Sequence, residues 1–422
     1  MSRFSVQGAE NLHEVTGKGR ATVARSTTVI LVCGALILSI AMGVRQSFGI
    51  FLEPIVLDLD LPRQTFALAI AVQNLLWGLT QPAAGMVADR FGTARVLSGG
   101  AAVYAVGLVV MGLSQSAGGL HLGAGLLVGL GMSATSFAVV LGAIGRFVPV
   151  ERRSMALGMA SAGGSLGQFL VVPLGQFLIE GVGWSISLIL LAGLAAAIVP
   201  LAIPLAGRAG SSGLLEESQT LSEALMEATR HPGFWLLTTA FFVCGFHVAF
   251  VATHIAVFAV SCGLPAMTGA TALSLIGLFN IAGTWLAGAL GGRYRKRYLL
   301  AAIYFLRGVV IIVLLLVPKT STNILIFSAV LGTLWLGTVP LTTGLVGEIF
   351  GPRYVATLFG IVFLGHQVGA FFGAWLGGLV FDATGSFDLM WFASIALALL
   401  AAVMHLPIRD RPVPRLSAAA SG

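Results

Sequence analysis

Long apolar stretches separated by short polar breaks follow one another along almost the whole chain. A membrane-spanning helix needs about 20 predominantly apolar residues, and stretches of that length recur about twelve times here. The predicted spans are 27–51, 65–87, 95–114, 119–144, 155–179, 184–206, 234–261, 267–290, 299–317, 323–347, 355–381 and 388–407. The pattern therefore predicts an all-α membrane protein with twelve transmembrane helices.

The two parts of the chain repeat one another when the sequence is shifted along itself. A shift of 202 residues aligns four glycine pairs: Gly158 with Gly360, Gly167 with Gly369, Gly175 with Gly377, and Gly183 with Gly385. A shift of 203 aligns Gly85 with Gly288, Arg90 with Arg293, Phe147 with Phe350, and Pro149 with Pro352. The repeat predicts two pseudo-symmetric six-helix bundles, a common design among membrane transporters.

The repeat also divides the chain into segments. We expect an N-terminal tail at 1–26, bundles at 27–206 and 233–408, a linker at 207–232 and a C-terminal tail at 409–422. Within the linker, Thr220 and Glu223 have the spacing of a capping box, which predicts a short helix that Pro232 ends. The first span is too long for a cleaved signal peptide and lacks a small-residue cleavage site, so we expect it to be retained.

Composition and charge agree with a membrane protein. The chain is 57% hydrophobic and only 9% charged, which excludes an ordinary soluble domain. Of its 23 Lys and Arg residues, all but Arg45, Arg63, Arg307 and Lys319 fall on one side if the N-terminus is inside. This bias predicts a multi-pass protein of the cell (inner) membrane with both termini cytoplasmic. It also accounts for the net charge of +7, so nucleic-acid binding is not expected.

The connection between the second and third spans reads GMVADRFGTARV. Its G-x-x-x-D-R-x-G-x-x-R pattern resembles the signature loop of the major facilitator superfamily, and GALGGRYRKR at 288–297 resembles a degenerate second copy. The resemblance implies that a cluster in this loop closes the cytoplasmic ends of the bundles when the protein faces outward. The gate residues that it implies are Gly85, Asp89, Arg90, Gly92 and Arg95, with Arg146 or Arg153 as partners.

Within that superfamily, GVRQSFGIFLEPI and RFVPVERRSMALGMASAGGSLGQ resemble the monocarboxylate transporter family, which includes bacterial organic-anion porters. The resemblance implies a carboxylate substrate. In the mammalian members a first-helix lysine engages the substrate, and alignment places Gln46 at that position with Arg45 one residue earlier. The eighth-helix Asp and Arg of the family are replaced by Asn280 and Thr284, so the usual carboxylate anchor is missing there.

Arg45 lies within the first apolar span, where an arginine costs roughly 2.5–3.5 kcal/mol on insertion scales. It either faces a polar cavity, with Glu53 as the nearest counterion, or extends to the outer headgroups. No predicted span has Asp or Glu at its centre, so the interior field should be positive and should favour an anionic substrate. Arg307 in the ninth span is expected to be structural and to reach a neighbouring carbonyl or Glu348.

Three histidines within spans could carry a coupling proton, since histidine titrates near neutral pH. His247 and His254 are seven residues apart on one face, and each could instead make a helix-to-helix hydrogen bond. His366 is the preferred candidate, because its helix adjoins the cavity in this superfamily. The predicted substrate-binding residues are Arg45, Gln46, Gln73, Asn74, Gln168, Asn280, Trp335, Thr338, His366 and Gln367.

These observations favour a secondary active transporter of a small organic anion, monocarboxylate-like, working by alternating access as a proton symporter or an anion exchanger. Efflux of an amphipathic drug or metabolite is the alternative, and a non-transporting membrane sensor is a third. An enzyme is not expected, because no nucleophile with its base and no metal-ligand cluster is present. We expect no cofactor and no metal, a lipid bilayer around the protein, a proton or counter-anion as co-substrate, and a monomer.

Overall fold

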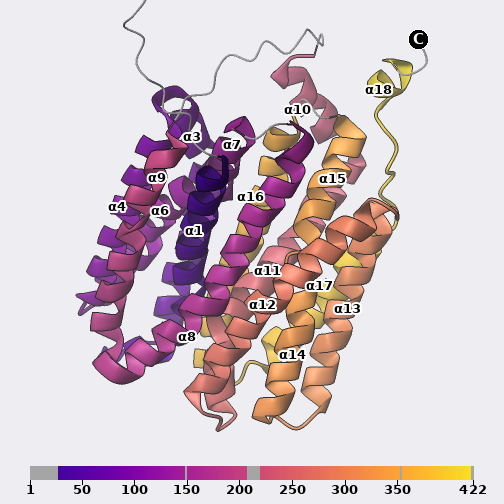
Figure 1. Ribbon diagram of the computed structural model, residues 1–422. Helices are drawn as coiled ribbons and strands as arrows, with labels where there is room; N and C mark the ends of the chain where they lie inside the picture. The colour runs from indigo at the N-terminus through magenta and orange to yellow at the C-terminus, as the bar shows by residue number, and fades with distance from the viewer. Residues whose placement is uncertain (1–26, 148–149, 207–218, 352–353, 420–422) are drawn as a thin grey trace, which may run out of the picture.

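Helices make up all the regular secondary structure in the described part of the chain (Figure 1). The computed structural model describes residues 27–147, 150–206, 219–351 and 354–419; it leaves out the side chains of 89, 145–155 and 417–419. The first bundle comprises α1 (Thr27–Gln46), α2 (Phe48–Asp58), α3 (Arg63–Phe91), α4 (Thr93–Gly112), α5 (Ala117–Leu120), the π-helix η1 (His121–Leu127), α6 (Val128–Thr135), α7 (Phe137–Phe147), α8 (Val150–Ala196), α9 (Ile198–Ala202) and η2 (Ile203–Leu205).

The second bundle follows the short helix α10 (Leu221–Arg230). It comprises α11 (Pro232–Ser261), α12 (Ala266–Gly291), α13 (Lys296–Leu316), α14 (Ser321–Thr333), α15 (Thr338–Phe350), α16 (Val355–Thr384) and α17 (Asp388–His405), and α18 (Pro414–Ala419) comes after it. The predicted capping box is confirmed: Thr220 and Glu223 each bind the other's backbone N–H at the start of α10. These hydrogen bonds lower the pKa of Glu223 below its ordinary value.

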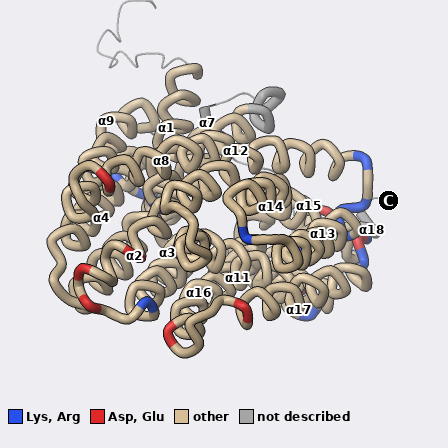
Figure 2. The backbone as a smooth tube through the Cα atoms, turned by 90° about the horizontal axis from the view of Figure 1, so that it is seen from below, with Lys and Arg blue, Asp and Glu red and all other residues tan. Residues whose placement is uncertain are grey.

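Ten helical stretches in the described residues are long and apolar enough to cross a membrane. One of these stretches, Ala156–Leu205, contains two crossings, because the chain leaves helical geometry at Gly183. Helix α3 is the twelfth crossing, although it is not among the ten apolar stretches. The first crossing continues to Asp58, seven residues beyond its predicted end. Charged residues lie mainly at helix ends and in connections, while the helices between are largely uncharged (Figure 2).

The aligned glycines have matching structural roles in the two bundles. Gly183 and Gly385 both end a helix with positive φ, +79° and +70°, a backbone conformation that glycine adopts without strain. A Cβ on Gly167 would overlap the backbone oxygen of Ser39 on α1, and one on Gly369 would overlap that of Phe242 on α11. The fifth and eleventh spans therefore pack closely against the first and seventh through the same repeated position.

The two bundles meet toward one end of the molecule. We call the end that carries α10 and α18 the termini face and the opposite end the far face (Figure 1). Close contacts between the bundles run from the middle to the far face: Gly78 with Gln367, Gly277 with Gln168, Gly378 with Ala67, and Gly49 with the oxygen of Ala252. At the far face, the Asp382 carboxylate accepts hydrogen bonds from the backbone N–H groups of Arg63 (3.2 Å) and Gln64 (2.7 Å).

At the termini face, the glycines near the span ends lie in open space. A Cβ on Gly85, Gly158, Gly288 or Gly360, each near the termini end of its span, would meet nothing within 4 Å. Among the described residues no hydrogen bond or ion pair joins the two bundles at this end. The described hydrogen bonds between the bundles therefore lie from the middle of the molecule to the far face.

Candidate functional site

Arg45 lies at the point where the first span is interrupted. Helix α1 ends at Gln46 and α2 begins at Phe48, with the Ser47 hydroxyl donating to the oxygen of Val44 (2.7 Å). The Arg45 side chain turns inward and is only 9% exposed. This places the guanidinium inside the protein and excludes the alternative that it extends to the headgroups.

The guanidinium is held by neutral groups. Its Nη1 donates to Oε1 of Gln46 (2.6 Å) and its Nη2 donates to Oδ1 of Asn74 on α3, whose own amide donates to the oxygen of Ile70. Its central carbon lies 5.4 Å from the ring centroid of Trp77, one turn beyond Asn74. The buried Nε has no hydrogen-bond partner among the described residues.

The expected counterion is engaged elsewhere. Glu53 accepts from Nε of Arg63 (3.0 Å) and forms an ion pair with it near the far face, so the prediction that Glu53 pairs with Arg45 is wrong. Glu53 follows Arg45 by eight residues, about 12 Å along a helix, whereas Arg63 at the start of α3 lies beside the Glu53 carboxylate. Among the described side chains, Arg45 is thus a buried cation without a carboxylate, an arrangement that an anion would stabilise.

A line of amides leads from Arg45 to the other bundle. Gln46 Nε2 donates to Oε1 of Gln168 on α8 (3.1 Å), and Gln168 Nε2 donates to the backbone oxygen of Leu273 on α12 (2.8 Å). Gln46 and Gln168, both predicted from sequence, are therefore brought together with Arg45 and Asn74.

Aromatic rings complete the contact on the side of the second bundle. Trp77 meets Phe363 of α16 edge to face at 5.8 Å, and Phe363 stacks on the His366 ring at 5.5 Å. Nδ1 of His366 lies 3.1 Å from Oε1 of Gln367, whose side chain lies against Gly78. Trp77 and Phe363 were not predicted; Trp77 could have been found, because it follows Asn74 by three residues on the same helical face.

The other two histidines are tied to neighbouring helices. Nε2 of His247 lies 2.9 Å from the oxygen of Ser394 on α17, and Nε2 of His254 lies 2.8 Å from the oxygen of Ala374 on α16. Both rings are almost fully buried. Each makes the helix-to-helix hydrogen bond that was the alternative to proton coupling.

Arg307 lies in a cluster inside the second bundle. It donates to the oxygens of Leu334 (2.7 Å from Nη2) and Trp335, two residues between α14 and α15, where the tenth span is interrupted. Its Nη1 lies 3.5 Å from Sγ of Cys244, and that sulfur lies 3.3 Å from the hydroxyl of Thr338. The expectation that Arg307 reaches a backbone carbonyl is confirmed.

Several other predicted residues have partners different from the ones that the sequence predicted. Glu348 pairs with Lys296, so it is not a partner of Arg307. Trp335 and Thr338 lie with Arg307, not with Arg45. Two further candidates make structural contacts: Gln73 donates to the oxygen of Ala124 in the fourth span (2.9 Å), and Asn280 donates to the Ser165 hydroxyl (2.9 Å) while accepting from the N–H of Leu336 (2.9 Å).

The sequence as a whole matches a known family. The family model described as Major Facilitator Superfamily matches residues 33–340 and 286–422, which together span most of the chain. The chain belongs to the major facilitator superfamily. It is therefore a transporter and not an enzyme, and the predicted fold of two six-helix bundles is confirmed.

Relatives of this transporter include carriers of small acids. It is 25% identical over 396 residues to the oxalate:formate antiporter of Oxalobacter formigenes, covering 92% of this chain and 93% of that protein. It is 26% identical over 384 residues to monocarboxylate transporter 11 of Mus musculus, covering 87% and 84%. The predicted resemblance to monocarboxylate transporters is thus confirmed.

A solved structure shows the same fold. A bacterial homolog of the human lysosomal transporter Spinster, crystallised in an inward-facing and occupied conformation, superposes with a TM-score of 0.71. The alignment covers 92% of this chain and 98% of that one at 18% identity.

The signature loop of the transporter lies at the termini face. Gly92 has a φ of +98°, which allows a tight turn between α3 and α4. The described basic residues make local contacts only: Arg90 lies 5.3 Å from the Phe91 ring centroid, and Arg95 donates to the oxygen of Phe91 (3.4 Å). The side chains of Asp89, Arg146 and Arg153 lie outside the described residues. A Cβ on Gly85 would meet no described atom within 4 Å, so no described helix lies close to it.

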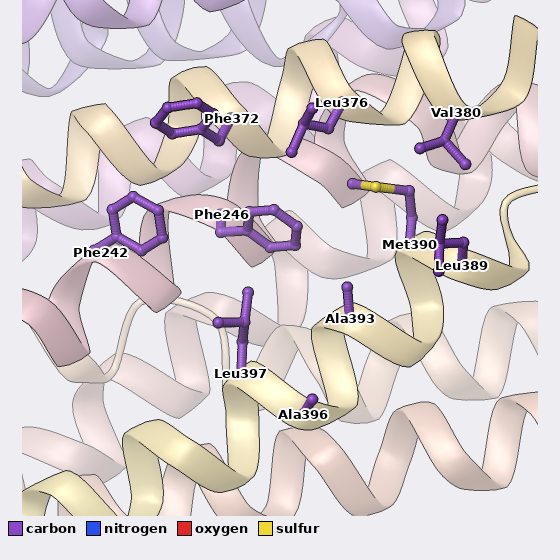
Figure 3. A pocket seen from close by; sticks show the side chains of 10 residues that line it. All are labelled: Phe242, Phe246, Phe372, Leu376, Val380, Leu389, Met390, Ala393, Ala396 and Leu397. Atoms are coloured by element: carbon purple, nitrogen blue, oxygen red, sulfur yellow. The ribbon is translucent and has the colours of Figure 1, made fainter. Parts of the chain in front are cut away.

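The transporter also has an apolar groove (Figure 3), and none of its lining residues belongs to the Arg45 network. It has a volume of about 640 Å³ and lies between α11, α16 and α17. Its lining is entirely aliphatic and aromatic: Phe242, Phe246, Phe372, Leu376, Val380, Leu389, Met390, Ala393, Ala396 and Leu397. Without a polar group, it offers nothing to bind the charge of an anion.

Proposed function

We propose that this protein transports a small organic anion, of the monocarboxylate class, by alternating access of its two bundles. The observation that carries the proposal is the buried Arg45 guanidinium, which has neutral partners in Gln46 and Asn74 and no carboxylate among the described residues. Only two of its five N–H donors are used by these amides, and a carboxylate can accept two such donors at once. The names of the relatives, an oxalate:formate antiporter and a monocarboxylate transporter, support the same class.

The surroundings of Arg45 suit a small, partly apolar anion. Trp77 covers the guanidinium from one side, and Phe363 extends the aromatic surface onto the second bundle. Burial strengthens the attraction between the guanidinium and a bound carboxylate, because little water screens it. The binding site therefore combines one fixed positive charge with an aromatic wall.

The proposal also includes the orientation of the protein in the membrane and the ion to which transport is coupled. We place the termini face in the cytoplasm of a cell whose inner membrane holds the protein, following the distribution of Lys and Arg. The structure then corresponds to an inward-facing state, and the signature loop closes that face in the outward-facing state. Coupling is either to a proton, carried by His366, or to a counter-anion, with a monomer as the working unit.

The test is a thermal-shift titration of the purified protein with formate, oxalate, acetate and lactate. Acetamide serves as a neutral analogue and a hydrophobic quaternary ammonium as a cation. A ligand present at 100 times its Kd stabilises the folded state by about 2.7 kcal/mol. We expect one or more carboxylates to raise the melting temperature and acetamide to have no effect.

The Arg45→Gln variant should lose this stabilisation, since charge-assisted hydrogen bonds to a buried cation contribute about 1.5–3 kcal/mol each. Arg295→Gln is the matched control, because it removes one positive charge at an exposed position and should behave as the wild type. Equal stabilisation of Arg45→Gln would contradict the anion site. Stabilisation by the hydrophobic cation alone would favour efflux of amphipathic compounds.

A further inference from the structure

The hydrogen bonds of the Arg45 network reach the second bundle through the side chain of Gln168. This side chain is 3% exposed and lies directly against Gly277 of α12, where a Cβ would come within 2.9 Å of its Cβ and Cγ. It accepts from Gln46 and donates to the oxygen of Leu273. Gln168 thus joins the arginine of one bundle to the backbone of the other.

The direction of every hydrogen bond in this line is determined by its two ends. The guanidinium of Arg45 can only donate, and the oxygen of Leu273 can only accept. Gln46 must therefore turn its oxygen to Arg45 and its NH₂ to Gln168, and Gln168 must turn its NH₂ to Leu273. Rotation of either amide by 180° would place two donors or two acceptors against each other.

We propose that Gln168 is a positioning residue that couples occupancy of Arg45 to the contact between α8 and α12. This inference rests on the proposed function, since it assumes that a carboxylate binds Arg45. In this proposal the carboxylate does not use only the donors that the amides leave free; it displaces the Gln46 oxygen from Nη1, so that Gln46 loses the partner that orients it. The Gln46 amide can then rotate, the Gln168 oxygen loses its donor, and the hydrogen bond to Leu273 is weakened.

The consequence is a change in the equilibrium between conformations. The contact of α8 with α12 belongs to the set that holds the bundles together toward the far face. A ligand shifts such an equilibrium only through interactions that differ between the two states. Loss of the hydrogen bonds from Gln46 to Gln168 and from Gln168 to Leu273 on binding supplies that difference. This loss favours separation of the bundles at the far face when substrate is present.

The same helix pair contains a matched control. The Ser274 hydroxyl on α12 donates to the oxygen of Phe169 on α8 (2.7 Å), beside Gln168 but with no connection to Arg45. Ser274→Ala removes one hydrogen bond between the bundles without touching the amide line. Gln168→Met removes both hydrogen bonds of Gln168 and retains an unbranched side chain of similar length against Gly277.

The experiment measures binding, transport and hydrogen exchange in the same variants. The probe is whichever of formate, oxalate, acetate and lactate stabilises the wild type most. We expect Gln168→Met to bind it with a Kd within about threefold of wild type while turnover falls about tenfold, the equilibrium change that one hydrogen bond contributes. Ligand should accelerate amide exchange along the α8–α12 contact in wild type and Ser274→Ala, but not in Gln168→Met.

A ligand-free double-mutant cycle separates this inference from the proposed function. Arg45→Gln and Gln168→Met should accelerate exchange at the α8–α12 contact non-additively, whereas Arg45→Gln and Ser274→Ala should be additive. Additive effects for the first pair, or equal behaviour of Gln168→Met and Ser274→Ala, would overturn the coupling role. Loss of carboxylate binding in Gln168→Met would make Gln168 a substrate ligand and would also overturn it. Failure of every carboxylate to bind wild type would instead overturn the proposed function.

Discussion

The surroundings of His366 differ from those of His247 and His254 in one chemical respect. His247 and His254 face backbone oxygens, which can only accept, and the Nδ1 atoms of both have no partner among the described residues. Protonation of either ring would therefore create a buried donor without an acceptor. His366 faces the amide of Gln367, which can rotate to offer an acceptor or a donor. Gln367 can therefore pair with Nδ1 of His366 whether or not that nitrogen carries a proton.

The first prediction concerns proton coupling through this pair. Replacement His366→Gln should flatten the pH dependence of carboxylate transport between about pH 5 and 8, the range in which histidine titrates. Initial rates of uptake into proteoliposomes at a series of pH values provide the measurement. His247→Gln is the control and should keep the wild-type profile; an unchanged profile in His366→Gln would exclude it as the proton carrier.

At the scale of elements, glycine decides how closely helices approach. Gly369 lies against the backbone of α11 at Phe242, whereas Gly360, nine residues earlier on the same helix, lies in open space. Close approach of backbones in membrane helices is favoured by small residues, because hydrophobic driving force between helices is absent there. The same residue type therefore has different roles at two positions of α16.

The second prediction compares these two glycines. Gly369→Ala should destabilise the protein by about 1–3 kcal/mol, because a methyl group there would force α11 and α16 apart. Gly360→Ala should leave stability unchanged or raise it by up to about 1 kcal/mol, since alanine favours helix more than glycine does. Thermal unfolding of both variants in the same detergent measures the difference, and equal melting temperatures would contradict the packing argument.

For the whole molecule, the relation between the bundles depends on a few contacts at the far face. The carboxylate of Asp382 on α16 caps the first turn of α3, which belongs to the other bundle, by accepting from the N–H groups of Arg63 and Gln64. The Arg63 guanidinium lies 4.8 Å from the ring centroid of Phe381 and also binds Glu53. The contacts of Asp382 and Phe381 with the start of α3 can exist only while the bundles are together at this face.

The third prediction follows from the cap. Loss of a side-chain cap costs about 0.5–2 kcal/mol, so Asp382→Ala should favour separation of the bundles at the far face severalfold. Hydrogen exchange of the first amides of α3 should accelerate. Asp388→Ala, which removes a carboxylate from the start of α17 on the same face, is the control and should leave these amides protected. Equal exchange in the two variants would show that the cap does not hold the bundles together.

The sequence by itself determined the spans, the repeat and the presence of an arginine inside an apolar helix, because hydropathy and residue spacing are local properties of the chain. It also predicted the glycine pairs, since the two bundles repeat one packing geometry. Only the tertiary structure decided which side chains form hydrogen bonds and ion pairs with one another. Arg45 binds Asn74, 29 residues away, while Glu53 binds Arg63, and Gln168 reaches Leu273 in the other bundle. These pairings depend on where a helix is interrupted and on which faces of distant helices meet, and neither can be read from spacing along one helix.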